Sequence, residues 1–375
     1  MQFTDITIEW SYLTFVFYIS IMCLSFFIAY AVGKRNFKWK TAHIKPCSIG
    51  IVFVAFLLLI IKCFNSTGRD LRTGYLYNFE SASSMSNYRD QTVESGFRLL
   101  TVIVKNITDN YGVFLVVVGI ITILPVVYII NRYRNMIDVP LVVFIYVSMY
   151  FINGFSAYRQ YMAVSISLMA VDAIIEKKPF KALIWIIVAS TIHTSCLVLL
   201  IPYILYYMKF LSNKIITILA AVFFAFFYFG RSLIALLLVR HERYSIYLVD
   251  SAIDFGFEQL VYYAPMFLLM YICKKYEKNK NIYRLTYIYL VVGFAFGMAS
   301  YILPILGRIQ SVFMPMAFLL SYYIKIYKQK NKRLNRILIS LCVLMYGICR
   351  FAIWIVQYYS MEDLMPYTNI FGGII

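Results

Sequence analysis

The chain has 375 residues, of which 62% are hydrophobic and only 14% are charged, and its mean hydropathy is +0.76. A soluble domain carries about a quarter of its residues as charges, and a soluble core of this size could not bury so much apolar surface. The composition therefore excludes a disordered chain, a disulfide-rich secreted module and an ordinary cytosolic enzyme. It indicates an all-α, polytopic membrane protein with room for roughly a dozen spans of about 20 residues.

The second feature is charge, because 35 Lys and Arg residues outnumber 17 Asp and Glu and leave a formal net charge of +18. Such an excess suggests nucleic-acid binding in a soluble protein, but no nucleic-acid motif is visible here. Most of the cations instead fall in six links between apolar runs, at positions 34–45, 132–134, 177–181, 209–214, 274–284 and 325–336. If all six links face the cytoplasm, the positive-inside rule holds along the whole chain. We therefore expect one multi-pass membrane domain over 1–375, with both termini extracytoplasmic.

The apolar runs predict the helices in chain order, near 11–33, 48–63, 111–130, 139–152, 161–175, 182–208, 215–238, 259–273, 285–303, 309–324 and 337–357. The run 182–208 lies between two basic links, so it has to enter and leave the membrane on the same side. It predicts a hairpin of two short helices that turns near His193, which brings the total to about 12 membrane-entering helices. Half-depth helices are tolerated only where they are buried in protein or line a wet cavity, so the turn is a candidate site.

Two longer polar segments, 64–110 and 239–258, are expected to be extracytoplasmic loops, and the first is expected to carry short amphipathic helices. Arg159 lies in a polar break, 153–160, between two short apolar runs. An arginine near hydrocarbon is costly and usually faces a cavity or an anionic partner. The alternatives are an arginine that reaches the lipid headgroups or one that pairs with a neighbouring acid.

Other polar side chains gather at the expected outer ends of the helices. His193 lies at the hairpin turn, where a neutral imidazole could accept a proton or could simply close the turn. Arg69, Arg240 and Arg308 lie near outer boundaries, and guanidinium groups suit phosphate oxygens because the planar fork is bidentate and always charged. Each could equally be an interfacial anchor or a member of a salt bridge. No P-loop, dinucleotide-binding fingerprint, HExxH or GxSxG motif is present, so nucleotide-driven chemistry is not expected.

Short motifs in this order resemble the EpsG-type branch of the Wzy polysaccharide polymerases. They are Gly68-Arg-Asp70, Glu94-Ser-Gly-Phe97, Tyr158-Arg-Gln-Tyr-Met-Ala163, His193-Thr-Ser195 and Pro366-Tyr367, and Arg308 fits the family's late arginine. One departure is Val312-Phe313, which stands where the family has a Tyr-Phe pair.

The resemblance implies an enzyme that joins oligosaccharide repeats linked to polyprenyl pyrophosphate into O-antigen, capsule or exopolysaccharide, by inverting glycosyl transfer at the outer face of the bacterial inner membrane. It implies no cofactor, no metal and no nucleic-acid partner. A chain-length regulator and a flippase are the expected protein partners. The expected catalytic residues are His193 and Arg159; Arg159, Arg308, Arg69 and Arg240 are expected to bind pyrophosphate, and Tyr158, Gln160 and Asp70 to bind the acceptor sugar.

Three other functions remain open at this stage. A lipid-linked oligosaccharide flippase would need cations at mid-depth and related halves, and no internal repeat is evident. A membrane O-acyltransferase would need a histidine within reach of a cytoplasmic acyl donor. A glycan ligase would share the proposed chemistry.

Overall fold

The computed structural model describes residues 7–32, 48–230, 257–277, 279–303, 305–371 and 373–374. Within these ranges the regular secondary structure is helical and there is no β-strand, only two isolated β-bridges, which confirms the all-α prediction. The first half contains α1 (Tyr12–Val32), α2 (Ile49–Phe64), η1 (Leu71–Tyr75), α3 (Leu76–Ser81), α4 (Ser95–Ile107), α5 (Tyr111–Tyr133), α6 (Val139–Tyr146), η2 (Val147–Phe151), η3 (Asn153–Phe155) and α7 (Tyr158–Ile175). The second half contains α8 (Pro179–Ile192), η4 (Thr194–Leu199), α9 (Leu200–Tyr207), α10 (Asn213–Phe229), α13 (Phe257–Cys273), η6 (Lys274–Tyr276), α14 (Lys280–Ala299), α15 (Ile305–Gln310), η7 (Ser311–Phe313), α16 (Pro315–Lys330) and α17 (Arg333–Tyr358).

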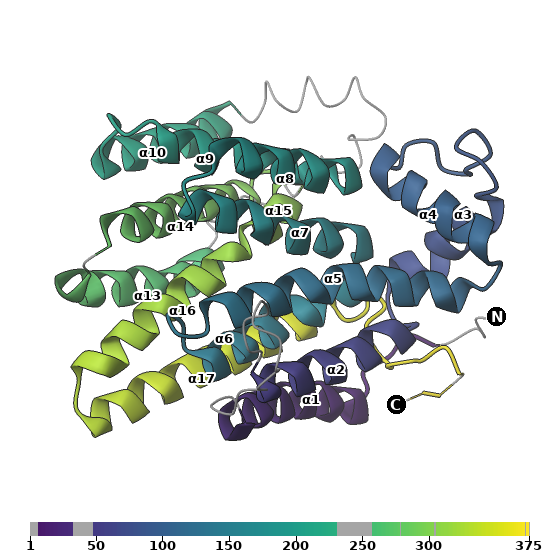
Figure 1. Ribbon diagram of the computed structural model, residues 1–375, viewed down its shortest axis with the longest axis horizontal. Helices are drawn as coiled ribbons and strands as arrows, with labels where there is room; N and C mark the ends of the chain where they lie inside the picture. Colours follow the sequence, from purple (N-terminus) through teal and green to yellow (C-terminus); the bar gives the residue numbers. More distant parts are fainter. Residues whose placement is uncertain are drawn as a thin grey trace, which may run out of the picture.

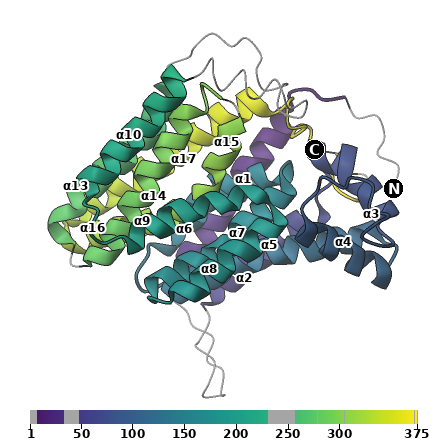
Figure 2. The same cartoon turned by 90° about the horizontal axis from the view of Figure 1, so that it is seen from above.

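The long helices lie side by side along the longest axis of the molecule, and α3 and α4 stand together beyond one end of them (Figure 1). These two short helices occupy the polar segment 64–110, as expected. The view from above shows α5, α7 and α8 on one side of the bundle and α10, α13, α14 and α16 on the other (Figure 2). The segment 239–256, most of the second predicted loop, lies outside the described residues.

Four helices in the described part of the chain are long and apolar enough to cross a membrane, namely α1, α5, α14 and α17. The count becomes five if the pair Leu306–Phe313 and Pro315–Lys330, bent by 41°, forms one span. Several other apolar helices are only 10–17 residues long. The expectation of about 12 membrane-entering helices therefore stays a prediction.

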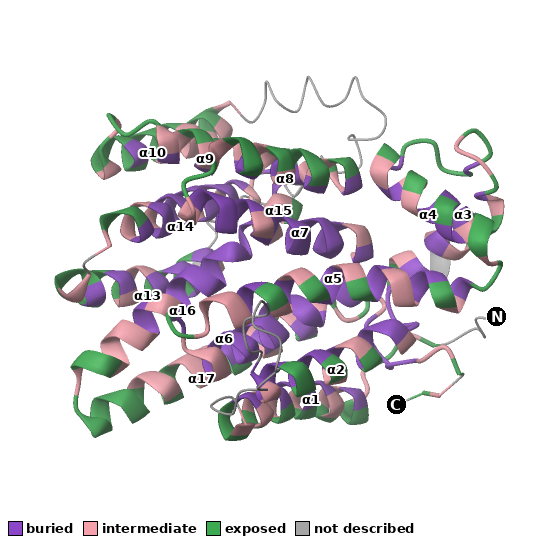
Figure 3. Cartoon of the chain, viewed as in Figure 1, coloured by how far each residue is buried: buried purple, intermediate pink, exposed green. Residues whose placement is uncertain are grey.

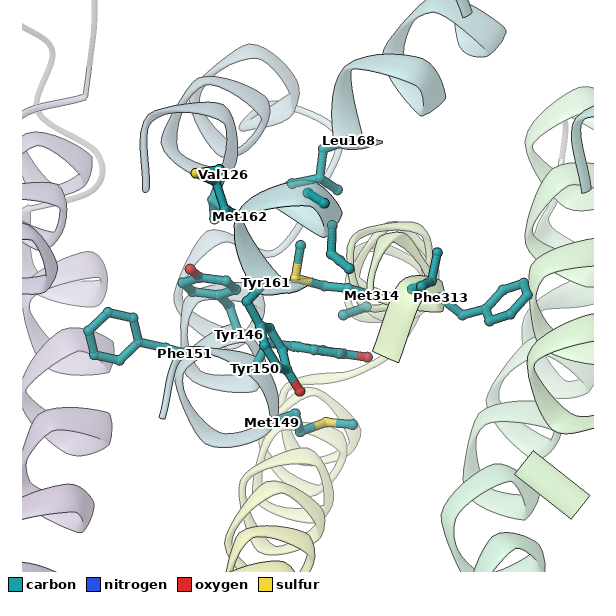
Figure 4. Close-up of a cluster of buried hydrophobic side chains, with 14 of the residues drawn as sticks. Val126, Tyr146, Met149, Tyr150, Phe151, Tyr161, Met162, Leu168, Phe313 and Met314 are labelled. Atoms are coloured by element: carbon teal, nitrogen blue, oxygen red, sulfur yellow. The ribbon is translucent and has the colours of Figure 1, made fainter. Parts of the chain in front are cut away.

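The buried core runs through the middle of the bundle, where α6, α7 and α14 are almost wholly covered (Figure 3). Figure 4 shows part of this core, in which Tyr146, Tyr150 and Tyr161 lie close together among aliphatic and methionine side chains. The peripheral helices instead expose large apolar side chains, such as Phe27 on α1, Phe56 on α2 and Met345 on α17. Lipid would cover these groups favourably and water would not, so their exposure fits a membrane protein.

The predicted hairpin is present in the structure. α8 ends at Ile192, His193 takes an extended conformation with φ −151°, and η4 and α9 then return along α8. The hydroxyl of Tyr203 on α9 lies 3.5 Å from the carbonyl oxygen of Pro179, the first residue of α8. The two arms therefore run antiparallel, and α8, with 14 residues and a rise of about 1.5 Å each, is shorter than a bilayer core.

The described basic links meet at the end of the bundle away from the hairpin tip. Arg132 at the end of α5 pairs with Asp172 near the end of α7 at 2.6 Å, and Lys328 near the end of α16 pairs with Asp138 at 2.8 Å. Asp172 is 13 residues beyond Arg159 along the continuous helix α7, which corresponds to about 20 Å. The cationic end and the Arg159 end of the bundle are therefore opposite ends, as the charge pattern predicts.

Candidate functional site

The break between α6 and α7 carries the first predicted site residue. The π-helical turn η2 and the short 3₁₀ turn η3 interrupt the helix, and α7 restarts at Tyr158. Beneath the break, the ammonium group of the buried Lys62 donates a hydrogen bond to the carbonyl of Gly154 and lies 3.4 Å from the centroid of the Tyr158 ring. These contacts fix the first turn of α7, and with it the position of Arg159.

Arg159 pairs with an acid, which is one of the alternatives that the sequence leaves open. Its Nη1 donates to Glu94 Oε2 at 2.7 Å, and its Nε donates to the hydroxyl of Tyr75 at 3.3 Å. The other oxygen of Glu94 accepts hydrogen bonds from the backbone N–H of Thr194 at 3.0 Å and from its hydroxyl at 3.1 Å. Glu94 therefore joins the start of α4, the start of α7 and the tip of the hairpin.

His193 sits next to this carboxylate at the hairpin tip. Its Nδ1 lies 2.7 Å from the Ser195 hydroxyl and accepts a hydrogen bond from the Ser195 backbone N–H at 3.3 Å. Burial lowers the pKa of His193 to about 4, because the neighbouring Glu94 carboxylate opposes burial only in part. A neutral imidazole whose Nδ1 accepts carries its proton on Nε2, so we assign the ring as a neutral hydrogen-bond donor.

Asp70 lies on the same side of the molecule, at the start of η1. Its carboxylate accepts a hydrogen bond from the Tyr75 hydroxyl at 3.1 Å. Burial raises the pKa of Asp70, although the bond from Tyr75 and the charges of Arg159 and Arg308 oppose that rise. A carboxylate with a raised pKa is better suited to take up a proton than an exposed one.

The backbone of Arg308 is held in position by hydrogen bonds from a side chain on α7. The side-chain amide of Gln160 donates to the Arg308 carbonyl oxygen and, at 2.5 Å, to the Ser311 hydroxyl. The Arg308 side chain itself is exposed, and its charge acts on the titration of both Asp70 and His193. Gln160 thus positions the segment that carries Arg308.

The C-terminal segment closes the site from one side. The N–H groups of Gly68 and Arg69 donate to the carbonyl oxygens of Asp363 and Glu362, each at 3.1 Å, and Ser66 N–H donates to Thr368 at 3.0 Å. Gly68 has φ +115°, and a Cβ atom there would lie 2.1 Å from the carbonyl oxygen of Phe155. Only glycine fits this close approach of two backbone segments, which explains the glycine at position 68.

These segments surround one cavity of about 710 Å³. Of the predicted site residues, the cavity is lined by Asp70, Arg159, Gln160, His193 and Arg308. Two others are not among the lining residues. Tyr158 is buried, with its hydroxyl bonded to Asn65 and to the Lys62 carbonyl, and Arg69 is exposed.

Arg240 lies outside the described residues. Among the residues that the structure describes, no group of three or more His, Cys, Asp or Glu side chains could hold a metal ion.

The family model that matches this chain, over residues 48–369, is that of the EpsG family. The chain belongs to the EpsG family. Membership suggests a polysaccharide polymerase-type role in a membrane, with a lipid-linked saccharide as substrate. No curated protein and no solved structure is similar enough to this EpsG-family chain to count as a match.

The cavity of this EpsG-family protein also has lining residues that sequence reasoning missed. Arg350 on α17, Glu258 on α13 and Glu362 after α17 all line it. Arg350 lies in an apolar stretch of the 26-residue helix α17, far from the two arginines in the first turn of that helix. A charged residue within an apolar stretch of a helix is a functional-site signal that could have identified it. Glu258 and Glu362 have no comparable signal, because each lies at a polar helix boundary.

Proposed function

We propose that this EpsG-family protein is a glycosyltransferase that joins oligosaccharide repeats linked to polyprenyl pyrophosphate at the outer face of a bacterial inner membrane. The observation that supports it best is that one polar cavity is lined by Asp70, Arg159, His193 and Arg308, which lie far apart in the sequence. Arg159 and the other residues of this site lie at the end of the bundle opposite the basic links. The positive-inside rule assigns those basic links to the cytoplasm.

The proposed step is an inverting displacement at the anomeric carbon of the donor. The oxygen of an acceptor sugar hydroxyl forms a bond to that carbon, and the bond from the carbon to the pyrophosphate oxygen breaks. Polyprenyl pyrophosphate leaves with the electron pair, and the hydroxyl proton passes to a base. Charge therefore develops on the leaving group, where fixed hydrogen-bond donors lower the barrier most effectively.

In this proposal Arg159 and Arg308 hold the departing pyrophosphate. His193 serves as a neutral donor from Nε2, either to the pyrophosphate or to the acceptor, because a pKa of about 4 makes it a weak base. Asp70, whose pKa is raised by burial, takes the hydroxyl proton. The link from Glu94 to Arg159 and Thr194 would keep the arginine and the histidine in register.

The test is to reconstitute the purified protein in liposomes with the lipid-linked repeat alone. We expect a ladder of products that differ by one repeat and appear without any nucleotide sugar. Movement of the lipid-linked repeat across the bilayer without chain growth would support a flippase instead. Transfer of the glycan to a different acceptor, with no ladder, would support a ligase.

A further inference from the structure

Part of the lining of this cavity comes from α13, α17 and the residues just after α14, and is not used by the proposed chemistry. We call this the α13–α17 arm, lined by Glu258, Tyr262, Tyr301, Arg350 and Trp354. The arm is held together by its own contacts. Glu258 accepts hydrogen bonds from the Tyr262 hydroxyl and, at 2.7 Å, from the Tyr301 hydroxyl.

The cation of this arm stands well inside a helix. Arg350 is eight residues before the end of α17 at Tyr358, which places it about 12 Å along the helix from that end. The guanidinium carbon lies 3.8 Å from the centroid of the Tyr262 ring. A charge at such a depth is tolerated where it faces a cavity, so the arm is a built polar space within an apolar helix layer.

The charges of the arm disfavour a second pyrophosphate. Glu258 belongs to the arm, and Glu362, which accepts a hydrogen bond from Ser156, lines the same cavity. Two carboxylates beside a single arginine would repel a polyanion, whereas carboxylates are strong acceptors for hydroxyl donors. The arm therefore suits a ligand rich in hydroxyl groups.

Its aromatic side chains point to the same ligand class. Trp354 and Tyr358 stack at 6.2 Å with an angle of 29°, and both line the cavity. Tyr150 and Tyr161, at the centre of Figure 4, form part of the cavity wall where it meets the core. Flat rings with polar edges offer apolar faces to the C–H groups of a sugar and hydrogen-bonding atoms to its hydroxyls.

We propose that the α13–α17 arm is a glycan-binding subsite that holds sugar residues of the repeat away from the pyrophosphate. This inference rests on the proposed function, because it assigns the two sets of lining residues to the two chemical halves of one lipid-linked substrate. Trp354 provides the stacking face, and Glu258 accepts hydrogen bonds from sugar hydroxyls.

The test measures binding rather than turnover, by calorimetric titration of the purified protein. The probe is the oligosaccharide released by mild acid from the lipid-linked repeat of the source cell, so it carries neither lipid nor pyrophosphate. We expect it to bind the wild type, to bind W354A roughly tenfold more weakly, and to bind W354F with only a small loss. I353A is the matched control, because the adjacent Ile353 does not line the cavity and should leave binding unchanged.

E258Q preserves size and removes the charge, so it keeps the test valid if W354A fails to fold. We expect E258Q to bind the oligosaccharide more weakly than the wild type does. In a separate titration, an excess of inorganic pyrophosphate should not displace the oligosaccharide from the wild type. Equal binding by wild type, W354A and E258Q would overturn the subsite, as would no binding to the wild type or displacement by pyrophosphate. Failure of the proposed function would look different, because the wild type would then form no ladder while still binding the oligosaccharide through Trp354.

Discussion

Glu94 offers the sharpest mutational test of the site, because one carboxylate joins three segments that are far apart in sequence. Its side chain is 14% exposed and that of its partner Arg159 is 21% exposed, so the pair is largely shielded from solvent. In E94Q the amide oxygen can still accept from Thr194, but the NH₂ group then faces the guanidinium, and one charge-assisted hydrogen bond is lost. Such a bond contributes about 1.5–3 kcal/mol.

We therefore expect E94Q to lower the free energy of unfolding by about 2 kcal/mol, measured by denaturant titration in mixed micelles. The same measurement on R159Q and on the double variant gives the coupling between the two side chains, expected to be of similar size. D90N is the matched control, because the exposed side chain of Asp90 accepts its hydrogen bonds from Thr92 in the same loop. Strictly additive losses in the double variant would refute the pairing.

The difference in unfolding free energy between wild type and E94Q should depend on pH, because it follows the pKa of Glu94. Burial raises that pKa, but the hydrogen bond from Thr194 and the charge of Arg159 lower it by more, so it lies below the ordinary value of 4.5. A carboxyl group with a lowered pKa contributes stability that is fully present above 4.5 and is lost as the pH falls through the folded-state pKa. The difference between wild type and E94Q should therefore be full at pH 7 and shrink below pH 4.5.

Three further substitutions test the roles of individual residues. R308A should reduce polymer formation roughly 100-fold or more, as expected for the loss of a transition-state donor. The amount of protein in membranes should be unchanged, because the Arg308 side chain is exposed. Polymer gels and immunoblots measure the two quantities, and a normal amount of polymer would exclude Arg308 as a pyrophosphate-binding residue. H193Q should keep far more activity than H193A, and neither should alter the pH–rate profile between about 6 and 8, since His193 is neutral there; a step near pH 6.5 that disappears in H193Q would show that the imidazole titrates. G68A should fail to accumulate as folded protein, because its Cβ would meet the Phe155 carbonyl at 2.1 Å; a yield and thermal stability equal to wild type would contradict this packing.

The charge pattern and the apolar runs predict much of this fold. The hairpin follows from two basic links on either side of the run 182–208, and the structure confirms it with the return of Tyr203 to Pro179. The polar break before Arg159 likewise appears as the interruption between α6 and α7. Both features depend on the pattern of hydropathy and charge along the chain, which a sequence displays directly.

The partners of the site residues could not be predicted in the same way. The pairing of Arg159 with Glu94 depends on how α4 packs against the hairpin, and nothing in the residue order specifies that contact. Tyr158 is adjacent to Arg159 in sequence, yet helix rotation turns it toward Asn65 rather than into the cavity. Arg350 was missed because it belongs to no motif, although its position inside an apolar helix is itself a signal.

The most direct measurement is the amount of polyprenyl pyrophosphate released per glycosidic bond formed, by mass spectrometry on liposomes that contain the purified protein and the lipid-linked repeat. The proposed displacement predicts one molecule of polyprenyl pyrophosphate for each repeat joined, with no nucleotide present, and the loss of both products in R308A. Bond formation without release of the lipid pyrophosphate, or release without bond formation, would contradict it.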